Sequence, residues 1–500
     1  MGDRLELIDR EIRRIPMACK DLREWIASLE REGEPIKVET EVDWNLEIGG
    51  IVREVCDTEG PAVIFNNIKD YKNTICARVF SGSLATFSRV ALMLGLPRDT
   101  PYRELIQVWR ERNKKPVKPV IVNKGPCKEN IVKGDAVDLF QLPVPHWSKL
   151  DGGRYISTFG GVVTKDANTG WENVGVYRAV VHDKRTTSMS VAQGQHIWYH
   201  WRSWRKQGKN MPLAIVIGGD PLIPAVGAAP VPLQIDEWDV QGGLRQEPVE
   251  LVKCETVDLR VPATSEIVLE GEVVTDVSTF LNDGPFSEFT GHYGGKSQRP
   301  IFKVNCMTFR NNPIFQGAIT GLPITEDHRV CSVSHSAIMW DLLEERMVGI
   351  TGVNADPSTA YANIIVQIDN SYYGQVQQVA ANIWSSTLSN MMGKNIIVCD
   401  EDVDIYNLDR VFWAIGYRVD PPRDIIQFPG WISALDPIVH PDERIGFGGN
   451  RGTRLLIDAT KAIDKPRSDK LFGERFAPVA YPDKDTMSKI RKNWKKYGFK

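Results

Sequence analysis

Two short segments of the chain contain residue types that could bind a carboxylic acid and move a proton. The first, WENVGVYR, has Asn173 and Arg178 on an alternating, β-type run. The second, DGPFSE, has Asp283 and Glu288 on either side of a Gly-Pro turn. Arginine holds a carboxylate through two parallel hydrogen bonds, and burial with like charge keeps one of two neighbouring acids protonated near neutral pH. These residues indicate general acid–base chemistry on an acidic substrate.

Three residues that lie further apart in the sequence form a candidate metal site. Asn173, His196 and Glu237 offer an amide oxygen, an imidazole nitrogen and a carboxylate. This mixed set suits Mn²⁺ or Mg²⁺ better than a soft thiolate-binding metal. No short ligand motif connects the three, and His196 could equally cap a helix or complete a buried hydrogen bond, so both interpretations stay open.

The charged residues have structural interpretations as well. Arg178 is either a charge at a strand edge or a buried clamp for a carboxylate. Asp283 and Glu288 are either solvated loop acids or a pair that shares one pocket. Glycines at 291, 294 and 295 follow directly, and they would let the loop backbone approach a ligand or move.

The composition excludes several classes of protein. The chain has 500 residues, enough for about three domains, and 42% hydrophobic with 25% charged residues is ordinary for a globular protein. A net charge of −3 gives no indication of a nucleic-acid or acidic-membrane partner. There is no run of about 18 apolar residues and no apolar signal segment, so we expect a cytoplasmic protein without a membrane span. The eight cysteines form no C-x-x-C pair, and we expect buried free thiols.

The hydrophobic pattern divides the chain into four parts. Residues 1–110 have an α/β pattern, with helices expected at 22–29 and 46–55 and a buried strand at 62–65. Residues 111–320 predict a mostly antiparallel sheet or small barrel, interrupted by a helix at 195–207. Its expected strands are 155–164, 173–181, 213–217, 249–256, 266–274 and 301–308.

The last two parts return to an α/β pattern. Within residues 321–475 we expect a helix at 330–348, a strand–helix–strand unit ending in strands 362–368 and 395–399, and a loop at 420–452. A βαβ unit predicts a parallel sheet. Residues 476–500 predict a terminal helix with Met487, Ile490, Trp494 and Tyr497 on one face. It either docks on its own chain, reaches a neighbouring subunit, or contacts a membrane or nucleic acid.

Two further segments are less specific. The glycine-rich run 446–452 lacks G-x-G-x-x-G spacing between a strand and a helix, which disfavours a dinucleotide site. Residues 198–209 mix tryptophan with basic residues, as single-strand binders do. An amphipathic helix that buries its tryptophans explains the same pattern more simply.

Taken together, the ordered motifs resemble the UbiD family of reversible decarboxylases, which use prenylated FMN. The resemblance extends over most of the chain. The residues that carry it are EVDWNLE (41–47), DGGRY (151–155), ENVGVYR (172–178), Gln195-His196, PVP (230–232) with Glu237, PA (262–263), EIVLEG (266–271), DGPFSE (283–288), and Trp413-Ala414 with Arg418.

The resemblance implies a fold and a cofactor site. The fold is a multi-domain α/β protein: an N-terminal α/β domain (1–110), a split β-barrel that holds the flavin (111–320), a C-terminal α/β dimerisation domain (321–475) and a terminal helix (476–500). Gln195 and Arg178 would contact the flavin, Lys394 its phosphate. The metal ligands implied are Asn173, His196 and Glu237 for Mn²⁺, and Val174, Ala228, Val231 and Arg418 for K⁺.

The resemblance also implies a reaction. Arg178 would hold the substrate carboxylate and Glu288, the flavin would accept electrons as CO₂ leaves, and Glu288 would supply the proton, with Asp283 completing the network. Asp283 is shorter than the glutamate often found there, which puts its reach in doubt. The expected substrate is a phenolic or benzoic-type acid, with His328 or His440 as candidate contacts to a ring substituent. A flavin prenyltransferase would supply the cofactor, and the protein would form a homodimer or larger homo-oligomer.

Three alternatives remain from the sequence. The substrate could be an α,β-unsaturated or heteroaromatic acid. The chain could be an ordinary FMN oxidoreductase that uses the same barrel, or a carrier of the modified flavin without turnover.

Overall fold

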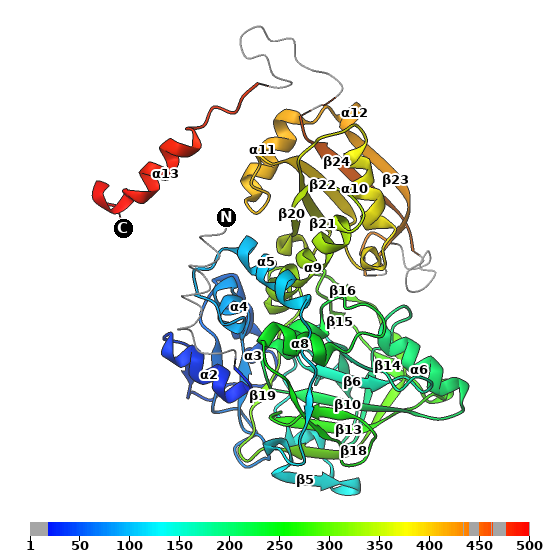
Figure 1. Cartoon of the computed structure of the whole chain (residues 1–500). Coiled ribbons are helices and arrows are strands. Elements are labelled where there is room, and N and C mark those ends of the chain that lie inside the picture. The colour runs from blue at the N-terminus through cyan, green and yellow to red at the C-terminus, as the bar shows by residue number, and fades with distance from the viewer. Residues whose placement is uncertain (1–18, 434, 440–449, 462, 464–476, 500) are drawn as a thin grey trace.

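The computed structural model describes residues 19–433, 435–439, 450–461, 463 and 477–499. Three main sheets follow one another along the chain (Figure 1). No helix in these ranges is long and apolar enough to cross a membrane. The predicted boundaries at residues 110, 320 and 475 stay predictions.

The N-terminal part is a small sheet covered by helices, as its α/β pattern predicts. The expected first helix is confirmed, because Leu22, Trp25 and Leu29 are fully buried. The strand order is β1-β2-β3-β19, so residues from far along the chain return to this sheet. The elements are α2 (Leu22–Arg31), β1 (Ile36–Val38), α3 (Glu47–Asp57), β2 (Val63–Phe65), β3 (Val79–Ser81), α4 (Phe87–Met93), α5 (Tyr102–Asn113) and β19 (Phe315–Gln316).

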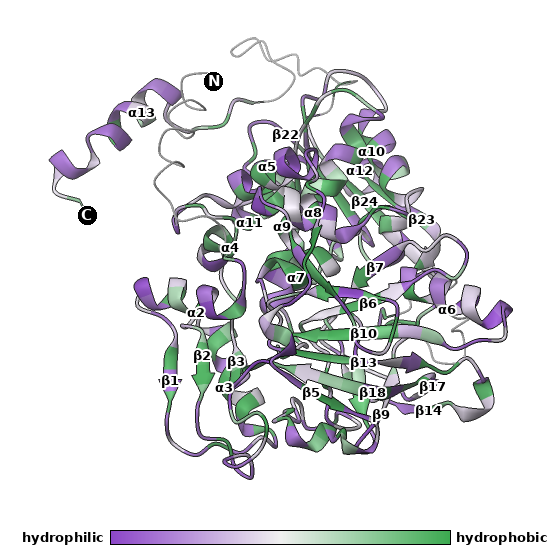
Figure 2. Ribbon diagram, turned by 60° about the horizontal axis from the view of Figure 1, so that its bottom comes forward, coloured by the Kyte–Doolittle hydropathy of each residue, from purple (hydrophilic) through white to green (hydrophobic). Residues whose placement is uncertain are grey.

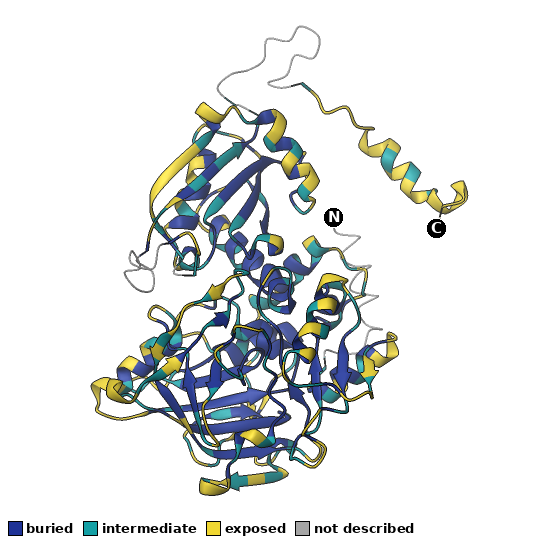
Figure 3. Ribbon diagram, turned by 180° about the vertical axis from the view of Figure 1, so that it is seen from behind, coloured by how far each residue is buried: buried dark blue, intermediate teal, exposed yellow. Residues whose placement is uncertain are grey.

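A curled, antiparallel, eight-stranded sheet forms the centre of the protein, and the predicted split barrel is confirmed. Figure 2 shows apolar residues along its strands, and Figure 3 shows that most of the sheet is buried. The order is β7-β6-β10-β13-β18-β9-β8, with β5 paired to β18. The strands are β5 (Asn130–Lys133), β6 (Gly161–Lys165), β7 (Glu172–Gly175), β8 (Ala179–Val181), β9 (Thr186–Met189), β10 (Met211–Ile217), β13 (Ile267–Val273) and β18 (Ile301–Phe309).

The expected single strand at 173–181 is wrong. The segment forms β7 and β8, which lie at opposite ends of the strand order, and the chain between them crosses the opening of the half-barrel. Gly175 permits this bend, because a Cβ there would lie 2.4 Å from the Tyr177 ring. Asn173 therefore lies on one edge strand, while Arg178 immediately precedes the other. The strand expected at 155–164 also begins only at residue 161.

Smaller elements surround the central sheet. The expected helix at 195–207 is confirmed, and Ile197 and Trp201 are buried in it. A three-stranded sheet, ordered β12-β11-β4, and two short hairpins, β14–β17 and β15–β16, complete this part. The bounds are α6 (His196–Lys206), α7 (Leu222–Gly227), α8 (Glu237–Arg245), β4 (Val120–Ile121), β11 (Glu250–Lys253), β12 (Arg260–Pro262), β14 (Leu281–Asp283), β15 (Phe286–Ser287), β16 (Tyr293–Gly294) and β17 (Ser297–Arg299).

The C-terminal part is a five-stranded sheet with the order β20-β21-β22-β24-β23. The predicted βαβ unit is confirmed, since β21 and β22 pair in parallel. The expected loop at 420–452 is wrong in part: β23 pairs along its whole length with β24. Its side chains are mostly exposed and Pro429 is tolerated because β23 is an edge strand. The bounds are α9 (Glu326–Glu344), β20 (Ile350–Ala355), β21 (Asn363–Ile368), α10 (Gln375–Trp384), β22 (Asn395–Asp400), α11 (Leu408–Arg418), α12 (Pro421–Asp424), β23 (Ile425–Ile432) and β24 (Asn450–Ala459).

The terminal helix α13 (Lys484–Lys492) has no buried residue. Figure 3 shows it standing away from the rest of the chain. Docking on its own chain, one of the interpretations of the sequence, is therefore wrong for this structure. All eight cysteines are free, as expected, and six of them are buried.

Glu326, the first residue of α9, connects this helix to the N-terminal part through hydrogen bonds. Its two carboxylate oxygens accept hydrogen bonds from the backbone N–H groups of Gly82 (2.6 Å) and Leu84 (2.8 Å). Burial raises the pKa of Glu326 from 4.5 to about 7. Between these pH values the folded state holds a proton that the unfolded state has released, so the unfolding free energy falls as the pH rises.

A Glu326→Gln variant has no such group to titrate. Its unfolding free energy, relative to that of the parent protein, should therefore rise from pH 4.5 to 7 by on the order of 3 kcal/mol. Urea unfolding of both proteins across this range measures the difference. The same substitution at the exposed Glu401 is the control, and parallel curves for parent and Glu326→Gln would contradict the assignment.

Candidate active site

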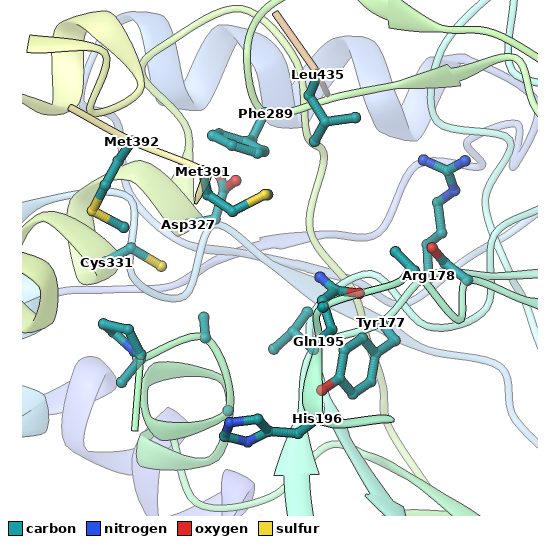
Figure 4. A pocket seen from close by; sticks show the side chains of 18 of the residues that line it. Tyr177, Arg178, Gln195, His196, Phe289, Asp327, Cys331, Met391, Met392 and Leu435 are labelled. Atoms are coloured by element: carbon teal, nitrogen blue, oxygen red, sulfur yellow. The ribbon is translucent and has the colours of Figure 1, made fainter. Parts of the chain in front are cut away.

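A cavity of about 1520 Å³ lies where the half-barrel meets α9 and the C-terminal sheet. It exceeds the roughly 300–1,000 Å³ of a typical small-ligand pocket, so a cofactor and a substrate can share it. Figure 4 shows His196 and Arg178 in separate parts of its wall, with Phe289 and Leu435 across from His196. The barrel contributes Arg178 and Glu288, and the C-terminal part contributes Met391 and Leu435.

Arg178 contacts both predicted acids, Asp283 and Glu288, so it is not a free charge at a strand edge. A clamp for a substrate carboxylate stays a prediction. Its Nε donates to Asp283 Oδ2 at 3.0 Å, its Nη2 lies 2.9 Å from the same oxygen, and its Nη1 pairs with Glu288 Oε1. The guanidinium also lies 4.8 Å from the centre of the Phe286 ring. The shorter side chain of Asp283 therefore reaches the arginine without difficulty.

Asp283 also has hydrogen-bond and charged partners that cannot be predicted from the sequence. The hydroxyl of Tyr155 donates to Asp283 Oδ1 at 2.8 Å and accepts the backbone N–H of Gly284 at 3.0 Å. Arg299 lies 4.0 Å from the same carboxylate, and burial lowers the pKa of this arginine. Asp283 is fully buried among these donors. Glu288 has Arg178 as its only side-chain partner among the described residues.

Glu288 lies at the tip of the β15–β16 hairpin. Its backbone N–H donates to His292 O at 3.0 Å, and a Cβ on Gly294 would lie 3.1 Å from its carboxylate. Asp151 anchors the same hairpin by accepting the N–H of Ser287 at 2.9 Å. Burial raises the pKa of Asp151 to about 6. The glycine near Glu288 thus makes room for the carboxylate in the cavity wall.

The candidate metal ligands meet at the other part of the cavity. His196 Nδ1 lies 2.8 Å from Asn173 Oδ1 and 3.8 Å from Glu237 Oε1. Burial raises the pKa of Glu237, while His196 and the backbone N–H of Val174 oppose this shift. Within the described ranges, no group of three or more His, Cys, Asp or Glu could hold a metal ion, so any site here depends on the amide oxygen of Asn173.

Other expected contacts lie along the same wall. Gln195, Val174, Ala228 and Val231 all line the cavity. The Oε1 atom of Gln195 is buried without a hydrogen-bond partner in the described structure. An unpaired hydrogen-bond acceptor beside the candidate metal ligands is what a site for a bound polar group would offer.

Two expected contacts, Arg418 and Lys394, are not found in the cavity. The K⁺ contact expected at Arg418 was through its backbone oxygen, but Arg418 lies outside the cavity lining, away from Val174, Ala228 and Val231. Its side chain is buried in the C-terminal part and pairs with Asp400 and Asp402 at 3.1 and 2.9 Å. Lys394 pairs with Asp436 at 2.7 Å and lies outside the lining.

The proposed contact between His328 and a ring substituent is wrong in this structure. His328 is fully buried, with Nε2 2.6 Å from Phe289 O and Nδ1 2.6 Å from the Thr325 hydroxyl. Both ring nitrogens are occupied. His440 lies outside the described residues.

Comparisons with known proteins identify the family of this chain. Residues 26–109, 118–323 and 328–459 match the N-terminal, Rift-related and C-terminal domains of UbiD, the 3-octaprenyl-4-hydroxybenzoate carboxy-lyase. The chain is 31% identical to pyrrole-2-carboxylic acid decarboxylase of Pseudomonas aeruginosa, over 96% of this chain and 98% of that protein.

Two solved structures extend the comparison. Vanillic acid decarboxylase of Sedimentibacter hydroxybenzoicus, in a closed form, has a TM-score of 0.85 and 31% identity, with coverage of 96% and 100%. The UbiD-class enzyme HmfF from Pelotomaculum thermopropionicum, in complex with FMN, has a TM-score of 0.80 and 25% identity, with coverage of 93% and 98%. The chain belongs to the UbiD family, and it is a carboxy-lyase of that family.

Proposed function

We propose that this protein is a prenylated-FMN-dependent, reversible decarboxylase of a phenolic or benzoic-type acid. The main support is the arrangement of the cavity. In one part Arg178 bridges two acids, and in the other part oxygen and nitrogen atoms that could bind a metal lie close together. The FMN bound by HmfF supports a flavin cofactor, and the vanillic acid decarboxylase supports a phenolic substrate. The pyrrole-2-carboxylic acid decarboxylase acts on a heteroaromatic acid, so it supports an aromatic acid in general. The proposed setting is a cytoplasmic homodimer or larger homo-oligomer.

The residues at the His196 part of the cavity fit a flavin phosphate held through a cation. Asn173, His196 and Glu237 would bind Mn²⁺, and backbone oxygens of Val174, Ala228 and Val231 would bind K⁺. Gln195, with its unpaired Oε1, would contact the cofactor. When bound, the prenylated flavin supplies the electron sink for loss of CO₂.

The residues around Arg178 would perform the proton chemistry. The side chain of Arg178 is 13% exposed and lines the cavity, so it can face a substrate carboxylate while it holds Glu288. Glu288 would deliver a proton to the carbon that loses CO₂, and would remove it in the carboxylation direction. Asp283, held by Tyr155, would keep Arg178 in place.

The mass of the bound ligand tests the cofactor. The protein is co-expressed with a flavin prenyltransferase, purified without oxygen and denatured, and the released ligand is weighed by mass spectrometry. We expect the mass of prenylated FMN. Plain FMN, or no flavin, beside a competent prenyltransferase would favour an oxidoreductase or a protein without this cofactor.

An Asp283→Asn variant should lose decarboxylation by roughly 10²-fold, because Arg178 loses the charged partner that holds it in place, while the metal-binding residues are unchanged. Turnover and flavin content are measured on the same preparation. Asp283→Glu keeps the charge and should retain most of the activity. Equal activity in the Asn and Glu variants would show that the ion pair with Arg178 does not matter.

A further inference from the structure

Helix α9 presents one continuous face to the cavity. Asp327, Cys331, His335, Ile338 and Leu342 all line the cavity and recur at helical spacing. Figure 4 shows Cys331 pointing into the cavity beside Met391 and Met392. His335, one turn further along this face, therefore points into the same compartment.

A row of aromatic rings runs from His335 to the β15–β16 hairpin, which carries Glu288. Phe289, which follows Glu288, stacks with Tyr361 at a centroid distance of 6.2 Å. Tyr361 stacks in turn with His335 at 4.9 Å and an angle of 13°. The apolar side chains around this row suit an aromatic ring.

The hydrogen bonds of His335 fix which of its nitrogens carries the proton. Nδ1 lies 2.6 Å from the backbone oxygen of Cys331, and a carbonyl can only accept, so Nδ1 is the N–H. Burial lowers the pKa of His335 to about 4, so the ring is neutral near pH 7. Nε2 is then a bare acceptor, and it has no hydrogen-bond partner among the residues that the structure describes.

The other polar groups of this row are occupied. The Tyr361 hydroxyl donates to Asp327 O at 2.9 Å, and both nitrogens of His328 are bound. The side chain of Asp327, which accepts from Thr325, is the other acceptor on this face of α9. The cavity wall also contains donors, among them Arg346 and the Ser386 hydroxyl. The unpaired Nε2 of His335 itself accepts only, so it favours an occupant that brings a hydrogen-bond donor to it.

We propose that His335 is a specificity-determining residue that accepts a hydrogen bond from a ring hydroxyl of the substrate, remote from its carboxylate. The inference rests on the proposed function and names the substituent that the same site recognises. A hydroxyl satisfies Nε2, whereas a methoxy or methyl group leaves it buried and unpaired. Such a loss disfavours the wrong ligand by about 10-fold or more.

Two substitutions distinguish the role of His335 Nε2 as a hydrogen-bond acceptor from the structural role of the ring. His335→Asn places an amide N–H near Nδ1, which keeps the bond to Cys331 O, and it has no atom at the position of Nε2. His335→Gln carries an oxygen near Nε2 and restores the acceptor. Ser386→Ala is the control, because this cavity residue already uses its hydroxyl on Ile383 O at 2.7 Å.

The test measures dissociation constants on cofactor-loaded protein that carries Glu288→Gln to prevent turnover. The probes are 4-hydroxy- and 4-methoxybenzoic acid, and 6-hydroxy- and 6-methoxy-2-naphthoic acid, which place the substituent at two distances. We expect the preference for hydroxyl over methoxy, in at least one pair, to fall about 10-fold in His335→Asn and to return in His335→Gln. The preference should persist in Ser386→Ala.

A preference that is unchanged in His335→Asn for both pairs would overturn the proposal. So would an equal loss in His335→Asn and His335→Gln, since that pattern indicates a packing role. Failure of the proposed function has a different signature: the loaded parent protein, with Glu288 intact, would release no CO₂ from any of these acids.

Discussion

A Glu288→Gln variant is expected to lose decarboxylation by roughly 10²–10⁴-fold while it keeps its flavin. Glutamine preserves the size of the side chain and a hydrogen-bond acceptor for Arg178, but it has no acidic proton to give. Asp283, the other acid that contacts Arg178, is fully buried and does not line the cavity, so it is not placed to replace Glu288 as the proton donor. Initial rates of CO₂ release, with flavin absorbance on the same sample, measure the effect.

Proton exchange gives a second measurement of the same role. The parent protein should exchange hydrogen at the reacting carbon of the decarboxylated product with D₂O, since a proton donor also works in reverse. Glu288→Gln should not, and nuclear magnetic resonance of the product detects the difference. Glu272→Gln, at an exposed position on β13, is the control. Activity and exchange within about threefold of the parent values would remove Glu288 as the proton donor.

A His196→Ala variant should lose metal and flavin together. Asn173 and Glu237 are its two neighbours at 2.8 and 3.8 Å, and loss of one ligand from a three-residue set should weaken metal binding by at least about 100-fold. Elemental analysis for manganese and absorbance for flavin are made on one purified sample. Both should fall to background in proportion.

His292→Ala is the matched control, because His292 lines the cavity beside Glu288 and is exposed. It should retain both components. A His196→Ala protein that is fully loaded, or one that loses flavin and keeps manganese, would contradict the assigned metal site.

The sequence predicts the fold best where apolar residues recur regularly. The runs that became β10, β13 and β18, and the stripe of Leu22, Trp25 and Leu29 in α2, needed no knowledge of distant contacts. The break between β7 and β8 could not be predicted in this way. It depends on the close approach of Gly175 to Tyr177 and on a hydrogen bond from Val176 N to Gly227 O.

The candidate site shows the same limit. Residue types and motifs brought together Arg178, Asp283 and Glu288, and the structure places them in contact. Arg418 was expected beside Val174, but it lies outside the cavity lining, and its pairing with Asp400 and Asp402 cannot be seen along the chain. Tyr155 lies in a quoted motif, but its role depends on a partner 128 residues away. His335 has no motif, and only its hydrogen bond to Cys331 and its place on α9 identify it.

The proposed function requires that these residues decarboxylate an aromatic acid with the help of a prenylated flavin. The most direct test compares CO₂ release by two preparations, one co-expressed with a flavin prenyltransferase and one expressed without it, on the hydroxybenzoic and hydroxynaphthoic acids. We expect CO₂ and the matching phenol from the first preparation alone, and loss of both in its Glu288→Gln variant. Equal release of CO₂ from both preparations, or no release from a preparation shown to contain prenylated FMN, would contradict the proposed prenylated-FMN-dependent decarboxylation.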